Sequence, residues 1–258
     1  MRKGLTKRID HLTGKAIHDW DMISENDRIL VGLSGGQDSQ TLINRLTAFK
    51  KRAPIRFEIF PVHIDPGFKG SFSKDLKAYI DRVYDPVRIE ATDFGIVAHS
   101  EENRENPCFL CSRLRRKRLF KIAKGLECRK LAFGHHKDDI IETLFVNIFY
   151  AGKIGTMKPK QPFFKGTLDI IRPLSYVERH EIKRFCQMKD LPVFGNNCPS
   201  SNMTKRIEVK QMLERMYKLN KHIKGNVFRA MSNIASEYLL DIDDDRHSKP
   251  TGLQKNSD

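Results

Sequence analysis

The sequence predicts an α/β fold, a doubly wound and mostly parallel sheet with added helices at the N- and C-terminal ends. Short apolar runs such as 28–33 alternate with segments whose apolar residues recur every three or four positions, which is typical of strands followed by amphipathic helices. A glycine-rich loop, residues 34–39, joins the first such strand to its helix. Ligands of such sheets bind at the carboxyl ends of the strands, so we expect the functional site there.

The elements follow in order from the same patterns. An N-terminal helix is expected within 1–24, because apolar residues from Leu5 to Trp20 form one stripe at helical spacing. An α/β domain should then occupy 25–200, with C-terminal helices in 201–240. The expected strands are 28–33, 55–64, 87–90, 130–134 and 169–172. The expected helices are 39–51, 74–84, 112–124, 138–150, 177–189, 203–219 and 226–240.

Two segments lack a core pattern. Residues 151–168 contain three glycines and two prolines, a composition that predicts a loop. The tail, 241–258, has a run of three aspartates and almost no apolar residue, so we expect it to be disordered.

Composition narrows the class of protein. Hydrophobic residues make up 39% of 258, mean hydropathy is −0.52, and no apolar run approaches the roughly 18 residues that span a bilayer. We therefore expect a cytoplasmic protein with no membrane partner. The net charge of +15 favours a polyanionic partner, most often nucleic acid. Five cysteines, an odd number, argue against a disulfide framework and favour metal binding or catalysis.

The glycine-rich loop, Ser34 to Ser39, predicts a phosphate site. Gly35 and Gly36 permit positive φ and let backbone N–H groups face an anion, at the positive end of the next helix. The lysine of a Walker A loop is missing, which favours holding a leaving pyrophosphate over transferring a γ-phosphoryl group. Asp38 would repel phosphates unless Mg²⁺ bridges them.

Two further strand ends fit an adenylate site. His63 and Ile64 end the second strand beside the loop, and Gly134 and His135 end a later one. Asp138 opens the helix after that strand; such an aspartate is ordinarily a helix cap, but its position favours a Mg²⁺ ligand or a base.

The cysteines form one short motif and three single positions. Cys108 and Cys111 make a CxxC, expected on a loop that runs into a helix. A CxxC can be a redox dithiol, half of a zinc site or part of an iron–sulfur site. Cys198 is the one other cysteine in a loop with turn chemistry, whereas Cys128 and Cys186 have the neighbours of buried core thiols.

A basic run follows the CxxC, from Arg113 to Arg118. Such runs are usually solvated faces. Because this run adjoins the cysteines, its position favours contact with phosphate or RNA no less than a solvated face. We therefore count Arg115 among the candidate catalytic residues.

The motifs together resemble a known family. Ser34-Gly-Gly-Gln-Asp-Ser39 after an apolar strand is similar to the PP-loop of ATP pyrophosphatases, the adenine nucleotide alpha hydrolase-like fold. The segments 108–116, 134–139, 145–152 and 171–174 closely resemble the tRNA 2-thiocytidine biosynthesis (TtcA) family. The resemblance implies an enzyme that uses ATP and Mg²⁺ to adenylate a tRNA base and then thiolates it, giving 2-thiocytidine at anticodon-loop position 32.

The resemblance also implies cofactors, partners and residues. A 4Fe-4S cluster would be held by three cysteines, here Cys108, Cys111 and Cys198. Bacterial members carry a second CxxC where this chain has Gly195 and Cys198, so Cys198 would have to be the third ligand. A sulfur donor such as a cysteine desulfurase is implied, and a homodimer is possible. The residues implied to bind ATP are Leu33, Ser34, Gly35, Gly36, Asp38, Ser39, His63, Ile64, Gly134 and His135.

Two other functions compete. A lysidine-type PP-loop tRNA ligase also adenylates a base but adds an amine, a reaction that needs no cluster. A non-catalytic RNA-binding protein with a relic nucleotide site is the third possibility, which the intact loop disfavours.

Overall fold

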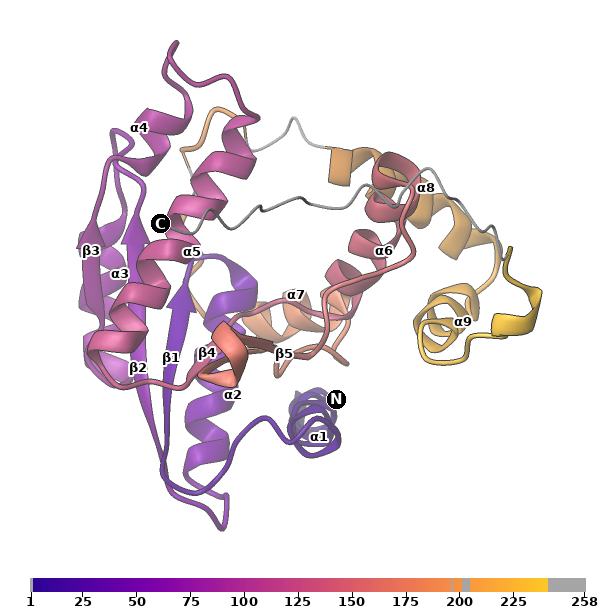
Figure 1. The fold of residues 1–258 in the computed structure, drawn as a ribbon. Coiled ribbons are helices and arrows are strands. Elements are labelled where there is room, and N and C mark those ends of the chain that lie inside the picture. The colour runs from indigo at the N-terminus through magenta and orange to yellow at the C-terminus, as the bar shows by residue number, and fades with distance from the viewer. Residues whose placement is uncertain (1, 196, 201–204, 241–258) are drawn as a thin grey trace, which may run out of the picture.

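The computed structural model describes residues 2–195, 197–200 and 205–240 (Figure 1). Its centre is a six-stranded sheet in the order β3-β2-β1-β4-β6-β5. The parallel strands are β1 (Asp27–Leu33), β2 (Phe57–Asp65), β3 (Arg88–Ala91), β4 (Lys130–Ala132) and β6 (Leu168–Ile171). β5 (Lys160–Phe163) pairs antiparallel with β6 at the edge. The α/β fold predicted from the sequence is confirmed.

Both faces of the sheet are covered, as the continuous apolar sequence of β1 requires. Ile29 and Val31 point into one core, and Leu30 points into another on the opposite face. On the first face pack α1 (Arg2–Asp19), α2 (Gln37–Lys50), α3 (Ser73–Val83) and α7 (Arg179–Lys189). α5 (Pro107–Gly125) covers the second face and lies in front of the sheet in Figure 1.

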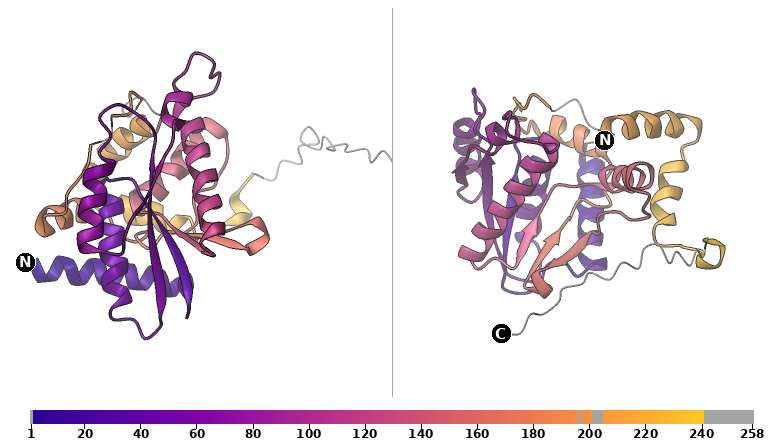
Figure 2. Two further views of the ribbon diagram at one scale, coloured as in Figure 1. Left: turned by 90° about the vertical axis from the view of Figure 1, so that its left-hand side faces the viewer. Right: turned by 45° about the horizontal axis from the view of Figure 1, so that its top comes forward.

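A separate helical layer stands beside the carboxyl ends of the strands. It comprises α6 (Lys137–Ala151), α8 (Lys205–Leu219) and α9 (Ile223–Ala230). Ile141, Val209 and Leu213 form its small core, and Figure 2 shows α8 and α9 running at an angle to each other on the outside of α6. The short elements α4 (Phe94–Ala98), η1 (Phe164–Gly166) and η2 (Ser236–Tyr238) complete the described fold.

The strand order reverses direction between β1 and β4. From β1 the chain crosses to β2 and β3 on one side, and β4 pairs with the other side of β1. Loops at such a point diverge and leave a crevice at the carboxyl ends. The glycine-rich loop after β1 and the turn after β4 therefore face each other.

Three predicted elements differ in the structure. The CxxC was predicted on a loop, which is wrong: α5 begins at Pro107, and the Asn106 side chain accepts hydrogen bonds from the N–H groups of Cys108 (3.0 Å) and Phe109 (3.3 Å). An Asn cap followed by a proline is a helix start that the prediction missed.

The second and third differences lie further along the chain. The segment 151–168 was predicted as loop but contains β5, an edge strand, where Pro162 is tolerated. The last helix ends at Ala230, well before the predicted residue 240. Residues 203–204 of the predicted helix and the tail 241–258 lie outside the described residues. No helix in the described part of the chain is long and apolar enough to cross a membrane.

Candidate active site

The loop after β1 is shaped to receive an anion. Gly35 has φ +82°, and a Cβ there would stand 2.6 Å from the ring of Phe72, so only glycine fits. The loop is braced by its own hydroxyls: the Ser34 N–H donates to Ser39 Oγ (3.2 Å), which donates to the Gly36 carbonyl (2.9 Å). Among the residues that the structure describes, no side chain caps the N-terminus of α2, so its first N–H groups can face a phosphate.

A cavity of about 230 Å³ opens beside this loop. It lies between the ends of β1, β2 and β4 and the helix α5, at the crevice that the strand order predicts. Its lining comprises Gly32, Leu33, Ser34, Asp38, Ser39, Val62, Ile64, Arg115, Leu119, Phe133, Gly134, His135 and Asp139. The structure thus gathers eight of the residues predicted for ATP and catalysis: Leu33, Ser34, Asp38, Ser39, Ile64, Arg115, Gly134 and His135.

Other predicted residues stand outside this lining. Gly35 and Gly36 shape the loop without facing the cavity. The His63 ring is buried, and its Nδ1 lies 2.8 Å from the Leu33 carbonyl oxygen. Burial is the main cause that lowers the pKa of His63, so its neutral ring ties β2 to β1 just below the loop.

Gly134 lets the turn after β4 touch the glycine-rich loop. A Cβ at this position would stand 2.8 Å from the carbonyl carbon of Asp38 and 3.0 Å from the nitrogen of Ser39. The two loops are therefore in backbone contact, and the floor of the cavity has no room for a side chain at Gly134.

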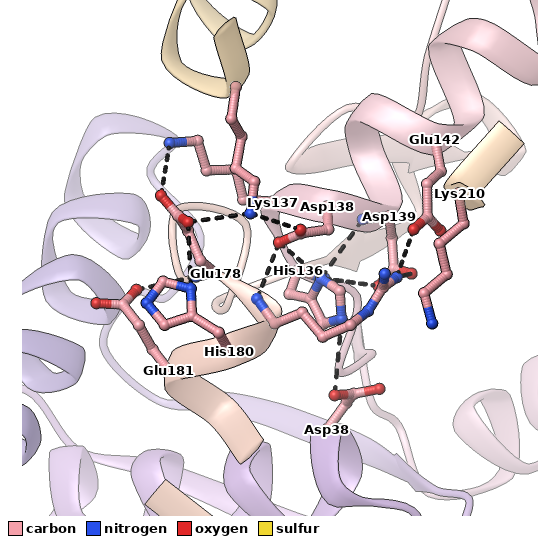
Figure 3. A network of polar contacts seen from close by, with 12 residues as sticks. Asp38, His136, Lys137, Asp138, Asp139, Glu142, Glu178, His180, Glu181 and Lys210 are labelled. Carbon is pink, nitrogen blue, oxygen red and sulfur yellow. Dashed lines mark hydrogen bonds and ion pairs between the residues drawn. The ribbon is translucent and has the colours of Figure 1, made fainter. Parts of the chain in front are cut away.

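Two carboxylates and a histidine meet at the rim of the cavity (Figure 3). His136 caps α6, and its Nδ1 accepts from the N–H of Asp139 (3.4 Å). The other ring nitrogen, Nε2, lies 3.7 Å from Asp38 Oδ1. Burial raises the pKa of the Asp38 carboxyl, His136 opposes this, and Asp139 adds to it. A cation between Asp38 and Asp139 would relieve that repulsion, and oxygen ligands are those that Mg²⁺ prefers.

Asp138 is engaged elsewhere. Lys224 of α9 donates to its Oδ1 (2.8 Å), and the Arg179 N–H donates to its Oδ2 (2.8 Å). Lys224 also donates to Glu178 (3.1 Å), the residue before α7, so one half-buried lysine joins α9 to α6 and to the start of α7. Burial would raise the pKa of Asp138, but the hydrogen bonds from Lys224 and Arg179 outweigh it and hold that pKa below its usual value.

Asp139, which the sequence did not single out, therefore faces the cavity, whereas Asp138 faces the C-terminal helices. Adjacent residues on a helix point about 100° apart, so only one of the pair can face the glycine-rich loop. The sequence signal that could have identified Asp139 is the helix cap formed by His136 with the residue three positions later.

The three predicted cluster ligands come together next to the cavity. Cys108 and Cys111 lie in the first turn of α5, and Cys198 lies close enough to raise the pKa of both thiols, although burial is the larger cause. Ser200, two residues beyond Cys198, hydrogen-bonds His99 (2.7 Å) and anchors this segment. In contrast, Cys128 and Cys186 are buried in the two cores.

Arg115 connects the cysteines with the cavity. It lies one helical turn after Cys111, and its positive charge opposes the rise of the Cys111 pKa. It also lines the cavity beside the glycine-rich loop. Within the described residues, no three His, Cys, Asp or Glu side chains converge tightly enough for one metal ion. Cysteine thiolates are the ligands that hold iron–sulfur clusters, so the chemistry of these three neighbouring cysteines fits such a group.

Comparison with known proteins agrees with this geometry. Residues 1–215 match the family model described as the PP-loop domain. The tRNA-cytidine(32) 2-sulfurtransferase of Syntrophotalea carbinolica is 37% identical over 240 residues, 92% of this chain and 93% of that protein. The enzyme of the same name from Bordetella avium is 39% identical over 256 residues, 96% of this chain and 80% of that protein. The chain therefore belongs to the PP-loop family and, within it, to the tRNA-cytidine(32) 2-sulfurtransferases, which confirms the resemblance found in the sequence.

A solved structure supports the fold. The U34-tRNA thiolase NcsA from Methanococcus maripaludis, with its 4Fe-4S cluster, superimposes with a TM-score of 0.77 at 21% identity, over 93% of this chain and 81% of that one. At this identity the likeness establishes the shared fold.

Proposed function

We propose that this protein is an ATP-dependent tRNA sulfurtransferase that adenylates the cytidine at position 32 and replaces its O2 with sulfur. The observation that carries the proposal is the position of Arg115, between the PP-loop cavity and the three cysteines. One site holds the activating nucleotide and the other offers thiolates, in a chain whose relatives are named for this reaction.

The first step is adenylation at the PP-loop. The base oxygen attacks the α-phosphorus of ATP, the bond to the bridging oxygen breaks, and pyrophosphate leaves with the electron pair. The open N–H groups at the start of α2 support a role in holding the departing phosphates, while the hydroxyls of Ser34 and Ser39 brace the loop that surrounds them. Arg115 is placed to stabilise the negative charge on the α-phosphate.

Asp38 and Asp139 fit the role of Mg²⁺ ligands. Both line the cavity, and burial and then the charge of Asp139 raise the pKa of the Asp38 carboxyl, an effect that a cation between the two would relieve. His136 holds Asp139 through the helix cap and stands beside Asp38, so it positions both carboxylates. Asp138 remains a candidate base by sequence position, but its contacts support a role in docking α9.

Cys108, Cys111 and Cys198 fit the role of 4Fe-4S ligands. Their proximity, on a helix start and on a segment anchored by Ser200, supports this set although Gly195 replaces a cysteine of bacterial members. When bound, a cluster with three cysteine ligands supplies one iron without a protein ligand, where inorganic sulfur can bind. These cysteines also separate the proposal from a lysidine-type ligase, whose chemistry has no use for them.

The proposal extends to partners. Sulfur would come from a donor such as a cysteine desulfurase, and the enzyme would act in the cytoplasm, where its tRNA substrate is found. A homodimer is supported by the exposed apolar side chains of Ile148, Phe149 and Tyr150 on α6.

The test is a reconstituted reaction. Protein loaded with iron and sulfide without oxygen is incubated with ATP, Mg²⁺, sulfide and an unmodified tRNA transcript, and the nucleosides are analysed by mass spectrometry. We expect 2-thiocytidine and AMP in equal amounts. AMP formation with an amine adduct instead of a thionucleoside would favour the ligase.

A further inference from the structure

A second and larger cavity adjoins the PP-loop cavity. It measures about 640 Å³ and lies between α5, the end of β4, α6, the segment 156–163 and α8. Arg115, Leu119, Phe133 and His135 line both cavities, so they form the wall that the two share. A molecule in the larger chamber would therefore meet the ATP phosphates at this wall.

The chamber carries positive charge that its own lining does not neutralise. Four arginines line it, and no aspartate or glutamate does: Arg115, Arg116, Arg172 and Arg206. Arg206 donates to Thr143 Oγ1 (2.9 Å) and has one distant acidic neighbour, Asp139, at 3.6 Å. Arg116 makes no hydrogen bond or ion pair with any residue that the structure describes.

Arg172 is the most unusual member because it is 6% exposed. It donates to the Lys158 carbonyl and to Gln161, but its Nε has no partner within the described residues. Burial, with Arg116 as a second cause, lowers its pKa to about 10. A buried guanidinium with an open N–H beside other arginines costs free energy, and an anion in the chamber would relieve that cost.

The walls also offer surfaces for a base. Phe133 and His135 stand with their ring centroids 5.5 Å apart at the shared wall, and Phe163, at the end of β5, also lines the chamber. RNA-binding sites stack unpaired bases on such rings and hold phosphates with arginine. The volume is within the roughly 300–1,000 Å³ of small-molecule sites, which suits one nucleotide with its flanking phosphates.

We propose that this chamber receives the target nucleotide of the tRNA, splayed out of its loop, with its phosphates on Arg116, Arg172 and Arg206. Its base would lie at the shared wall, where its exocyclic oxygen can approach the α-phosphorus beside Arg115. The inference rests on the proposed function and adds the residues that hold the substrate.

The experiment compares two double variants of equal charge. Arg116→Gln with Arg206→Gln removes two arginines of the chamber, whereas Lys117→Gln with Arg184→Gln removes two exposed cations that do not line it. Binding of an unmodified tRNA transcript is titrated at several salt concentrations. If each lost arginine held a phosphate, affinity falls on the order of tenfold per contact, and the log–log salt slope falls by about 0.7–0.9 per contact.

The outcomes separate the two proposals. A chamber variant that binds tRNA with the affinity and slope of the charge-matched control overturns the inference, and so does one that loses ATP binding, because the arginines would then maintain the fold. If wild type binds tRNA through these arginines but forms no thiocytidine, the proposed reaction is wrong, whereas the proposal that the chamber binds the nucleotide is retained.

A second measurement locates the base. A transcript with 4-thiouridine at the target position is irradiated in the complex, and the crosslinked peptides are identified. Crosslinks to peptides that contain Phe133 or Phe163 are expected. Crosslinks confined to α8 and α9 would place the base outside the chamber and overturn the inference.

Discussion

Gly134→Ala is the substitution whose effect follows most directly from the geometry of the site. The new Cβ would stand 2.8 Å from the Asp38 carbonyl carbon, about 0.6 Å inside the 3.4 Å at which ordinary contact begins. The obstacle is backbone and cannot swing aside, so the PP-loop has to move. Overpacking of this kind costs about 1–3 kcal/mol, which would weaken ATP binding roughly 5- to 150-fold if the loop must return to its present position to bind.

The assay is ATP affinity by calorimetry, together with the melting temperature. Each kcal/mol of lost stability lowers Tm by roughly 2–4 °C in a protein of this size. Gly14→Ala is the control, because a Cβ at this position in α1 meets nothing within 4 Å and a glycine-to-alanine change inside a helix stabilises by about 0.5–1 kcal/mol. A Gly134→Ala protein with unchanged Tm and unchanged ATP affinity would refute the contact between the two loops.

Three further predictions test the rest of the site. Asp38→Ala should abolish tRNA-dependent pyrophosphate release without lowering Tm; release at the wild-type rate would remove this carboxylate from the mechanism. Cys198→Ser should lose both iron and thiolation, whereas Cys128→Ser should lose neither, as measured by iron content after anaerobic purification. Lys224→Met should destabilise by up to about 3 kcal/mol, because it removes the ammonium that pairs with the buried Asp138 and with Glu178. The fold lowers the pKa of Asp138, so the stabilisation from its pair with Lys224 is present above about pH 4 and is lost as the pH falls below that value. Denaturant titrations should therefore show this acid loss of unfolding free energy in the wild type and not in the variant.

Much of the site was predictable because its residues follow strand ends directly. Ser34, Ile64 and Gly134 each lie within two residues of the carboxyl end of a parallel strand, so the topology alone brings them to one edge of the sheet. The glycine-rich loop was equally plain in the sequence, because Gly35 has no alternative in its left-handed conformation.

Features of the site that depend on side-chain orientation or on contacts between distant segments could not be predicted from the sequence. Asp138 and Asp139 are neighbours in sequence, and beyond the helix cap that holds Asp139, the contact of Asp138 with Lys224 of α9 comes only from tertiary packing. Arg172 and Arg206 are 34 positions apart and join one chamber only because α8, which carries Arg206, packs against α6. Local patterns carry no information about such encounters.

Thiolation of cytidine 32 of tRNA with ATP can be followed by mass spectrometry of tRNA after the anaerobic reaction, with fragments mapped to the anticodon loop. We expect 2-thiocytidine at position 32, in amounts that depend on ATP and disappear in Cys108→Ser. Thiouridine in place of thiocytidine, or thiocytidine formed without ATP, would contradict this expectation.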